Sequence, residues 1–356
     1  MGNKMKSALK LQQIDRYPEE LLSCDARALQ QIFPQPTLLH LTGKQQRPIF
    51  ISVLLHGNET TGFLAVQQLL KKYAGQVLPR AISIFFGNTQ AAELNVRRLE
   101  QQPDYNRIWP ATEMNAGLET QLAEDIVTAM RQKQVFMSID IHNNTGLNPH
   151  YACINKLDKP FLQLANLFSR IVVYFTRPLG VQSGAFAELC PSVTLECGRP
   201  EQQKGVDHAL SYLNDCLHLK ELNQSVVHHQ DIELVHTVAQ VKVKPSIDFS
   251  FHDHNSDLLF KTDLERFNFT EIPAGTCFGL IKEGSEMPLS VIDEQGVDIT
   301  EQFFTLNGKR LEIKRATIPS MLTLNEQVIQ QDCLCYLMEN IPLEKADASP
   351  VKFTLT

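Results

Sequence analysis

The sequence predicts an α/β fold, with a mostly parallel or mixed sheet covered by helices on both faces and a smaller C-terminal β-rich domain. Between residue 47 and about residue 220, short apolar strands alternate with segments of helical periodicity. Strands that are apolar on both faces and separated by helices are typical of a mostly parallel sheet with two helical layers. From about residue 225 the pattern changes to short strands and turns. We therefore expect two domains, over residues 1–224 and 225–356.

The elements of the first domain follow from apolar spacing and helix breakers. Pro34 and Pro36 end a short helix, and Gly75 closes an amphipathic one. A further helix has apolar residues at helical spacing from Leu118 to Met130. We expect helices near 26–32, 61–73, 118–132 and 159–169, and strands at 49–55, 81–86, 135–141, 171–175 and 193–196.

The second domain has the pattern of a β structure. Residues 235–243 alternate between apolar and polar side chains. Asn307-Gly308 lies between the apolar runs 303–306 and 311–313, which is a strong signal for a hairpin. Further strands are expected at 258–260, 277–281 and 333–338.

Composition excludes several classes of protein. A net charge of −7 without a long basic stripe disfavours nucleic acid as a partner. No run of about 18 apolar residues is present, so no membrane partner is expected. The first ten residues lack the apolar core of a signal peptide, and the eight cysteines form no CxxC pair. These features favour a cytoplasmic protein with free thiols and give no indication of its oligomeric state.

Two histidines and a glutamate follow the ends of two predicted strands. His56-Gly57-Asn58-Glu59 ends the strand 49–55, and His142 ends the strand 135–141. In an α/β sheet such strand ends meet at one edge, where ligands bind. Two histidines and one glutamate with an open fourth position are a catalytic zinc set, although the usual helical signature of two histidines four apart is absent. We predict one Zn²⁺ per chain, held by His56, Glu59 and His142.

Two more carboxylates lie in apolar strands. Glu196, in the strand 193–196, suits a general base that takes a proton from metal-activated water. Asp140 shares a strand face with His142. It either supports that ligand or forms a buried ion pair elsewhere.

The other polar clusters have weaker signals. The irregular stretch with Arg97, Arg98, Asp104, Asn106 and Arg107 is either an anion site or a solvated loop, and composition alone favours the loop. His252-Asp253-His254 lacks a third ligand and is predicted to be a solvated turn, and His228-His229 a surface segment.

In sequence order, these motifs resemble those of the succinylglutamate desuccinylase and aspartoacylase family, a branch related to the zinc carboxypeptidases. The resemblance covers about residues 45–345 and implies a zinc carboxypeptidase-like fold. Thr89 stands in place of the family's proline, and Asn143-Asn144-Thr145-Gly146 departs from the threonine and small residue that usually follow the second histidine. The matching segments are His56-Gly57-Asn58-Glu59, Gly87-Asn88, Asp104-Tyr105-Asn106-Arg107, Asp140-Ile141-His142, Thr194-Leu195-Glu196-Cys197-Gly198 and Ile272-Pro273-Ala274-Gly275-Thr276.

The resemblance also implies roles. Glu196 would be the general base, and Asn106 and Arg107 would hold a substrate carboxylate. Arg98, with Arg97 as the alternative, would polarise the scissile carbonyl. Arg177 and Arg199 are candidates for binding a second, outer carboxylate.

These expectations amount to a zinc-dependent hydrolase that cleaves the amide bond of a small anionic N-acyl amino acid. The first alternative is a zinc carboxypeptidase acting on short or modified peptides. The second is a zinc-binding protein without turnover, against which the presence of Glu196 argues. We also expect the β-rich domain to border the active site and to limit access to small substrates.

Overall fold

The computed structural model describes residues 9–222 and 231–342. Within them the chain forms two compact units. The first contains the chain up to Asn143, Tyr151–Val172 and Pro178–Ile232; the second contains Asn144–His150, Val173–Arg177 and the chain from Glu233 onward. The expected boundary at residues 224 and 225, and His228-His229, lie outside the described residues. That the second domain borders the active site stays a prediction.

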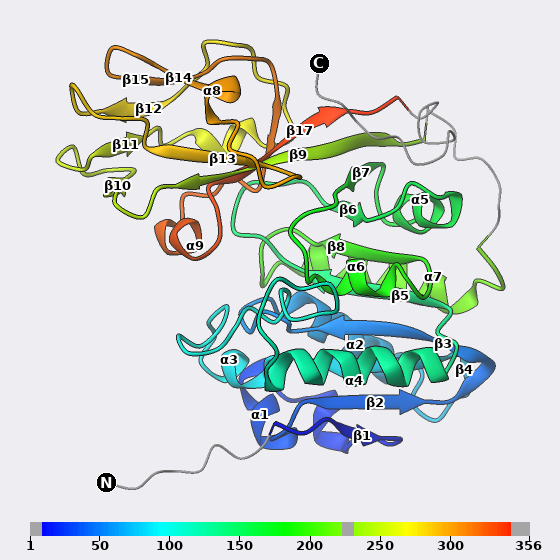
Figure 1. Ribbon diagram of the computed structural model, residues 1–356. Coiled ribbons are helices and arrows are strands. Elements are labelled where there is room, and N and C mark those ends of the chain that lie inside the picture. Colours follow the sequence, from blue (N-terminus) through cyan, green and yellow to red (C-terminus); the bar gives the residue numbers. More distant parts are fainter. Residues whose placement is uncertain (1–8, 223–230, 343–356) are drawn as a thin grey trace, which may run out of the picture. The chain divides into compact units, whose positions relative to one another are not determined.

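The sheet of the first unit is mixed, as predicted. Its strand order is β1-β2-β4-β3-β5-β8-β6 (Figure 1). The four central strands, β4, β3, β5 and β8, are parallel to one another, whereas β2 pairs antiparallel with β4 and β6 pairs antiparallel with β8. The strands are β1 (Gln12–Ile14), β2 (Thr37–Leu41), β3 (Gly43–Val53), β4 (Leu78–Phe86), β5 (Met137–His142), β6 (Tyr151–Ile154) and β8 (Ser192–Glu196), and β7 (Ile171–Tyr174) begins in this unit and ends in the second.

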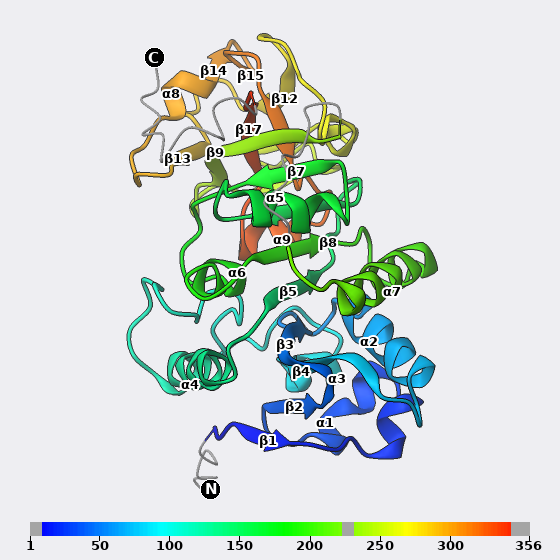
Figure 2. The ribbon, with the colours of Figure 1, turned by 90° about the vertical axis from the view of Figure 1, so that its right-hand side faces the viewer.

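Helices cover both faces of this sheet. Figure 2 shows α2 (Thr61–Lys72) and α7 (Gln203–His218) on one face, and α4 (Leu118–Gln132) and α6 (Gln182–Phe186) on the other. The second layer encloses an aromatic core in which the rings of Phe50 and Phe186 stack with their centroids 4.3 Å apart. The remaining helices of this unit are η1 (Glu19–Leu22), η2 (Ala26–Ala28), α1 (Leu29–Ile32), α3 (Thr89–Glu93) and α5 (Lys159–Asn166).

The second unit is rich in β structure. One sheet has the order β10-β11-β12-β15-β14, and β9 pairs with β13 and β17, which pairs with β16. The predicted hairpin is confirmed: β14 and β15 pair from Asn307↔Arg310, and Gly308 has a φ of +61° at the turn. The elements are β9 (Glu233–Val243), β10 (Phe249–Ser250), β11 (Leu258–Phe260), η3 (Leu264–Phe267), β12 (Cys277–Ile281), β13 (Leu289–Asp293), α8 (Thr300–Phe303), β14 (Phe304–Asn307), β15 (Arg310–Ile313), β16 (Ile318–Ser320), α9 (Glu326–Gln331) and β17 (Cys335–Asn340).

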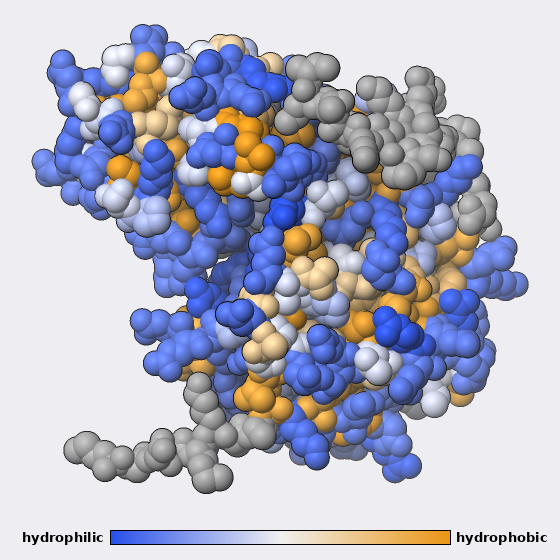
Figure 3. All heavy atoms as spheres, viewed as in Figure 1, coloured by the Kyte–Doolittle hydropathy of each residue, from blue (hydrophilic) through white to orange (hydrophobic). Residues whose placement is uncertain are grey.

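The surface and the thiols agree with the composition. The face in Figure 3 mixes hydrophilic residues with scattered hydrophobic ones. All eight cysteines are free. Among the described residues, no helix has the length and apolar character that a membrane span requires.

Candidate active site

A tight turn after β3 brings His56 and Glu59 together. The backbone N–H of Glu59 donates to the carbonyl of His56 at 3.1 Å, and Nδ1 of His56 lies 2.8 Å from Oε1 of Glu59. Gly57 is required here, because a Cβ at this position would lie 2.2 Å from the backbone carbon of Ala91. The turn therefore fixes both side chains at the end of β3.

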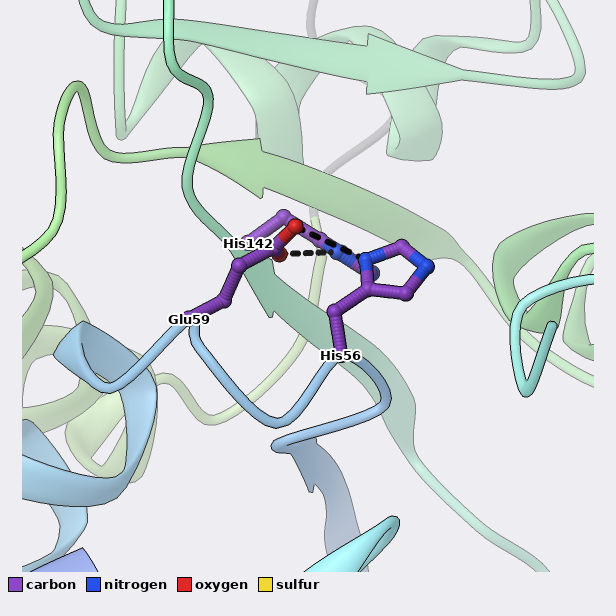
Figure 4. Close-up of side chains that lie close together, drawn as sticks. All are labelled: His56, Glu59 and His142. Atoms are coloured by element: carbon purple, nitrogen blue, oxygen red, sulfur yellow. Dashed lines mark hydrogen bonds and ion pairs between the residues drawn. The ribbon is translucent and has the colours of Figure 1, made fainter. Parts of the chain in front are cut away.

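The last residue of β5 completes the group. Nδ1 of His142 lies 2.7 Å from Oε2 of Glu59, so the carboxylate of Glu59 lies between two imidazoles (Figure 4). Ligand atoms of His56, Glu59 and His142 all lie within 4.8 Å of one another, and all three residues are buried. The structure brings together the three residues predicted as zinc ligands.

Each imidazole is also held from behind by a carboxylate. Nε2 of His56 lies 2.9 Å from Oδ1 of Asp104, and Nε2 of His142 lies 2.7 Å from Oδ2 of Asp140. Asp140 is fixed in turn by the hydroxyl of Ser52 at 2.6 Å. Carboxylates in this position orient metal-binding histidines. Of the two alternatives for Asp140, the support of His142 is the one that its contacts favour.

The charges of this cluster reinforce one another. Burial alone would raise the pKa of Glu59, but the facing His56 and His142 lower it well below its usual range. Burial opposes protonation of His56, as does Arg97, yet Asp104 and Glu59 outweigh them and raise its pKa. Burial opposes protonation of His142 too, but Asp140 and Glu59 raise its pKa well above 6.5. Binding of a cation by these residues would therefore compete with protonation of the two imidazoles.

Glu196 ends β8 next to the second histidine. It is the direct register partner of His142 on β5, and the N–H of Cys197 donates to the carbonyl of His142 at 3.0 Å. Glu196 is 7% exposed. Paired positions on neighbouring strands point to the same face of a sheet, so this carboxylate lies on the same face as His142.

The two adjacent arginines are oriented differently. Arg97 donates from Nη2 to Oδ2 of Asp104 at 2.9 Å, and its Nη1 lies 3.6 Å from Glu59. Arg98 instead donates from Nη1 to the carbonyl of Gln102 at 3.0 Å. The structure thus brings Arg97, and not Arg98, to the histidine and glutamate group.

Asn106 and Arg107 lie in the same loop as Asp104. Nδ2 of Asn106 is 3.2 Å from Nε2 of His142, and its Oδ1 accepts from the N–H of Gln182 at 2.9 Å. Nη1 of Arg107 donates to the carbonyl of Asn106 at 2.8 Å, and the charge of Arg107 contributes to the lowered pKa of Asp104. Asn106 and Asp104 both contact a histidine of the group. The stretch that composition alone favoured as a solvated loop is therefore part of the site.

Other polar residues singled out by sequence have different places. Asn88 caps α3, since its Oδ1 accepts from the N–H of Ala91 at 3.1 Å. Arg177 belongs to the second unit and donates to the carbonyl of Glu294 at 2.7 Å, whereas Arg199 is exposed after β8. His252 and His254 are exposed in a turn, as predicted.

Sequence reasoning missed two contributors. Asp104 was assigned no role beyond its place in the loop and in a matching segment, although it contacts both His56 and Arg97. Asn143 was noted only as a departure from a family pattern, although its N–H donates to Oε2 of Glu59 at 3.1 Å. The position of Asn143 directly after His142, a candidate ligand, was the available signal. No local pattern links Asp104 to His56.

The motifs also match a family description. Residues 45–202 match the model for the succinylglutamate desuccinylase/aspartoacylase catalytic domain. The matched segment is similar to the catalytic domain of this family. This similarity supports a hydrolase of the deacylase class. No curated protein matches the chain by sequence.

Several solved structures share the fold. Succinylglutamate desuccinylase from Vibrio parahaemolyticus has a TM-score of 0.57 at 16% identity, over 86% of each chain. The enzyme from Chromobacterium violaceum has a TM-score of 0.54 at 17% identity, over 83% of this chain and 85% of its own. Murine aminoacylase 3 has a TM-score of 0.51 at 12% identity, over 84% of this chain and 97% of its own.

Proposed function

We propose that this chain is a zinc-dependent amide hydrolase that cleaves small N-acyl amino acids. The observation that carries the proposal is the buried group of His56, Glu59 and His142, in which both Nδ1 atoms face one carboxylate. Two imidazole nitrogens and a carboxylate oxygen are the donor set of a catalytic zinc site with an open position. When bound, zinc supplies a Lewis acid that polarises a carbonyl and makes water more acidic.

Glu196 is proposed as the general base. Its carboxylate takes a proton from the attacking water and then delivers it to the nitrogen of the departing amine. Its place beside His142 in the sheet register supports this role. A buried carboxylate at the end of a rigid strand is held in position for both transfers.

Arg97 is proposed to polarise the scissile carbonyl, in preference to Arg98. Its guanidinium is held by Asp104 and directed towards Glu59. A fixed guanidinium stabilises the negative charge that develops on the carbonyl oxygen during attack. Arg98 provides a matched control, because it is the adjacent arginine and its hydrogen bonds go to backbone carbonyls.

The substrate is proposed to carry a free carboxylate close to the scissile bond. Arg107 can bind a carboxylate with two parallel hydrogen bonds, and Asn106 can add another donor. This role of Asn106 and Arg107 follows from the family resemblance and from their position in the loop that contacts His142. The small acyl amino acid is therefore the favoured class of substrate.

The deciding experiment is a panel of N-acyl amino acids and dipeptides, assayed with the wild-type chain and the Arg107→Lys variant. Lysine cannot form the two parallel hydrogen bonds of arginine, so kcat/KM should fall by about one to two powers of ten. This fall corresponds to a loss of about 1.4–2.8 kcal/mol of transition-state stabilisation, because each 1.4 kcal/mol is tenfold in rate. The loss should be much smaller for a substrate with a carboxamide in place of the carboxylate. Equal losses for both substrates would contradict a carboxylate site at Arg107.

The same panel separates the rival functions. Faster turnover of dipeptides would favour a carboxypeptidase, which would use the same ligands and the same arginine. Zinc bound at His56, Glu59 and His142 without turnover of any substrate would favour a binding protein.

Arg97→Lys should lower kcat far more than Arg98→Lys if Arg97 polarises the carbonyl.

A further inference from the structure

Asn143 is a buried polar residue with hydrogen bonds to three segments of the site. It is 4% exposed and follows His142 directly. Its Nδ2 donates to Oγ1 of Thr61 at 2.9 Å and to the carbonyl of Gly198 at 2.8 Å. Its Oδ1 accepts from the N–H of Thr61 at 3.2 Å, and its own N–H donates to Oε2 of Glu59 at 3.1 Å. One side chain thus joins the ends of β5 and β8 to the start of α2.

These partners surround the chemical groups of the site. Thr61 is two residues after Glu59, and Gly198 is two residues after Glu196. Gly198 has a φ of +74°, so the chain turns sharply where its carbonyl accepts from Asn143. The bonds of Asn143 therefore fix the segment that carries Glu59 relative to the segment that carries Glu196.

The chain beyond Asn143 is fixed as well. Residues Asn144–His150 belong to the second unit, where Oγ1 of Thr145 donates to Oγ1 of Thr323 at 2.9 Å. Oδ1 of Asn148 accepts from the N–H of Met321 at 3.0 Å. Gly146 passes so close to this chain that a Cβ would lie 2.0 Å from the carbonyl oxygen of Leu322. Asn143 is therefore held between a strand and an anchored loop and has little freedom to move.

We propose that Asn143 is a positioning residue that sets the distance between the metal ligand Glu59 and the base Glu196. This inference rests on the proposed function, because the proposed function assigns the roles of metal ligand and base to Glu59 and Glu196. Only an amide has the two donors and the acceptor that this position uses. A threonine, which the family resemblance suggests here, offers one hydroxyl, and alanine offers no polar side-chain atom.

The test compares Asn143→Ala and Asn143→Thr with the wild-type chain and with Tyr212→Phe. Tyr212 is a matched control because its buried hydroxyl donates to the carbonyl of Leu164 at 2.9 Å, on α7 and α5. Zinc affinity is measured by competition with a chromogenic chelator, and kcat and KM are measured at saturating zinc. Asn143→Ala should weaken zinc binding by about 10–100-fold, the usual effect of losing an outer-shell partner.

At saturating zinc, Asn143→Ala should also lower kcat by roughly tenfold or more with KM within about twofold, because the base is displaced while the carboxylate site is intact. Asn143→Thr should lie between Asn143→Ala and wild type. Tyr212→Phe should retain wild-type zinc affinity and kcat. When the variants are compared at the same fraction of folded protein, a loss of folding cannot account for values that fall from wild type through Asn143→Thr to Asn143→Ala.

The outcomes separate the inference from the proposed function. If wild type and both Asn143 variants bind zinc equally well and turn over equally fast, the positioning role is overturned and the hydrolase proposal stands. The positioning role is also overturned if Tyr212→Phe matches Asn143→Ala in both measurements. A wild-type chain that binds no zinc and cleaves no member of the panel overturns both.

Discussion

At the scale of single residues, the site is built from pairs of a histidine and a carboxylate. His56 and His142 each contact Glu59 through Nδ1 and a second carboxylate through Nε2. The second contact fixes which nitrogen faces the cluster and makes the imidazole a stronger ligand. The carboxylates behind the histidines should therefore affect metal affinity although they do not face the metal position.

Asp104→Asn tests this arrangement. The amide cannot carry the charge that supports His56 and holds Arg97, so zinc affinity should fall by about 10–100-fold. The measurement is chelator competition at constant pH. Glu326→Gln is a suitable control, since Glu326 accepts from Oγ of Ser250 in the second unit. Unchanged affinity in Asp104→Asn would show that His56 does not depend on this partner.

Glu196→Gln tests the proposed role of Glu196 as the general base. Glutamine is nearly isosteric with glutamate but does not take a proton at neutral pH, so kcat should fall by about 10²–10⁴-fold. Zinc content by elemental analysis and melting temperature should stay near wild type. Near-normal kcat in this variant would mean that another group is the base.

At the scale of elements, the residues of the candidate site lie at the ends of strands, and pairing along the strand interiors fixes how these ends are aligned. β3, β5 and β8 run parallel, so His56, His142 and Glu196 arrive at the same edge of the sheet. Near the β1 edge of this sheet, His40 of β2 contacts both neighbouring strands. Its Nδ1 lies 2.8 Å from Oγ of Ser83 on β4, and its Nε2 lies 3.0 Å from Oε1 of Gln13 on β1. This histidine should make the stability of the sheet depend on pH.

The pH dependence has a defined sign. Burial, followed by the charge of Lys133, lowers the pKa of His40 to about 4 from an ordinary value of 6.5. The unfolded chain therefore takes up this proton first, and folded-state stability is lost as the pH falls from 6.5 towards 4. Urea unfolding at pH 7 and pH 5 measures how much unfolding free energy each protein loses at the lower pH. The loss in His40→Gln should be smaller than the loss in wild type by about 1 kcal/mol, after allowance for the partial exposure of His40. Equal losses in both proteins would contradict the shift.

The predictable elements were those with a strong local signal. Apolar strands next to polar strand ends identified β3, β5 and β8, and Asn307-Gly308 identified its hairpin. The helix α7 was missed because its first turn contains Gly205 and its N-cap, Gln202, makes no side-chain bond. Strand β6 was missed because its four residues include only one β-branched side chain, Ile154, whereas the equally short β7 has three.

For the candidate site, contacts between residues far apart in the sequence could not be predicted. The grouping of the candidate metal ligands at strand ends could be predicted, since parallel strands share an edge. The contact between Asp104 and His56 joins residues 48 positions apart through an irregular loop. The choice between Arg97 and Arg98 depends on loop geometry, which spacing does not determine.

At the scale of the whole molecule, the chain alternates between its two compact units. It passes between them at residues 143–144, 150–151, 172–173, 177–178 and 232–233. The segment Val173–Arg177 contacts the rest of the second unit through Glu294, which also lies 2.9 Å from Nε2 of His236. The second unit therefore includes pieces of chain that sequence order places in the first domain.

A chain that ends at residue 222 should for this reason be unstable. Residues 144–150 and 173–177 would lose partners such as Thr323 and Glu294. Its melting temperature should be at least about 10 °C lower than that of the full chain, which corresponds to roughly 3–5 kcal/mol at this size. Circular dichroism melts of both chains provide the measurement. A truncated chain with the wild-type melting temperature and zinc affinity would show that the first unit is independent.

The bond between Thr145 and Thr323 also has a consequence for synthesis on the ribosome. Its two partners are separated by 178 positions in the chain. At 5–20 residues per second, roughly 9–36 s pass between the emergence of the loop after His142 and that of its anchor. During this interval the nascent chain already has all three candidate metal ligands, but the loop that follows the last of them lacks its partner Thr323. This loop therefore reaches its anchored position only after Thr323 has emerged, and a chaperone that shields the loop would act within that interval.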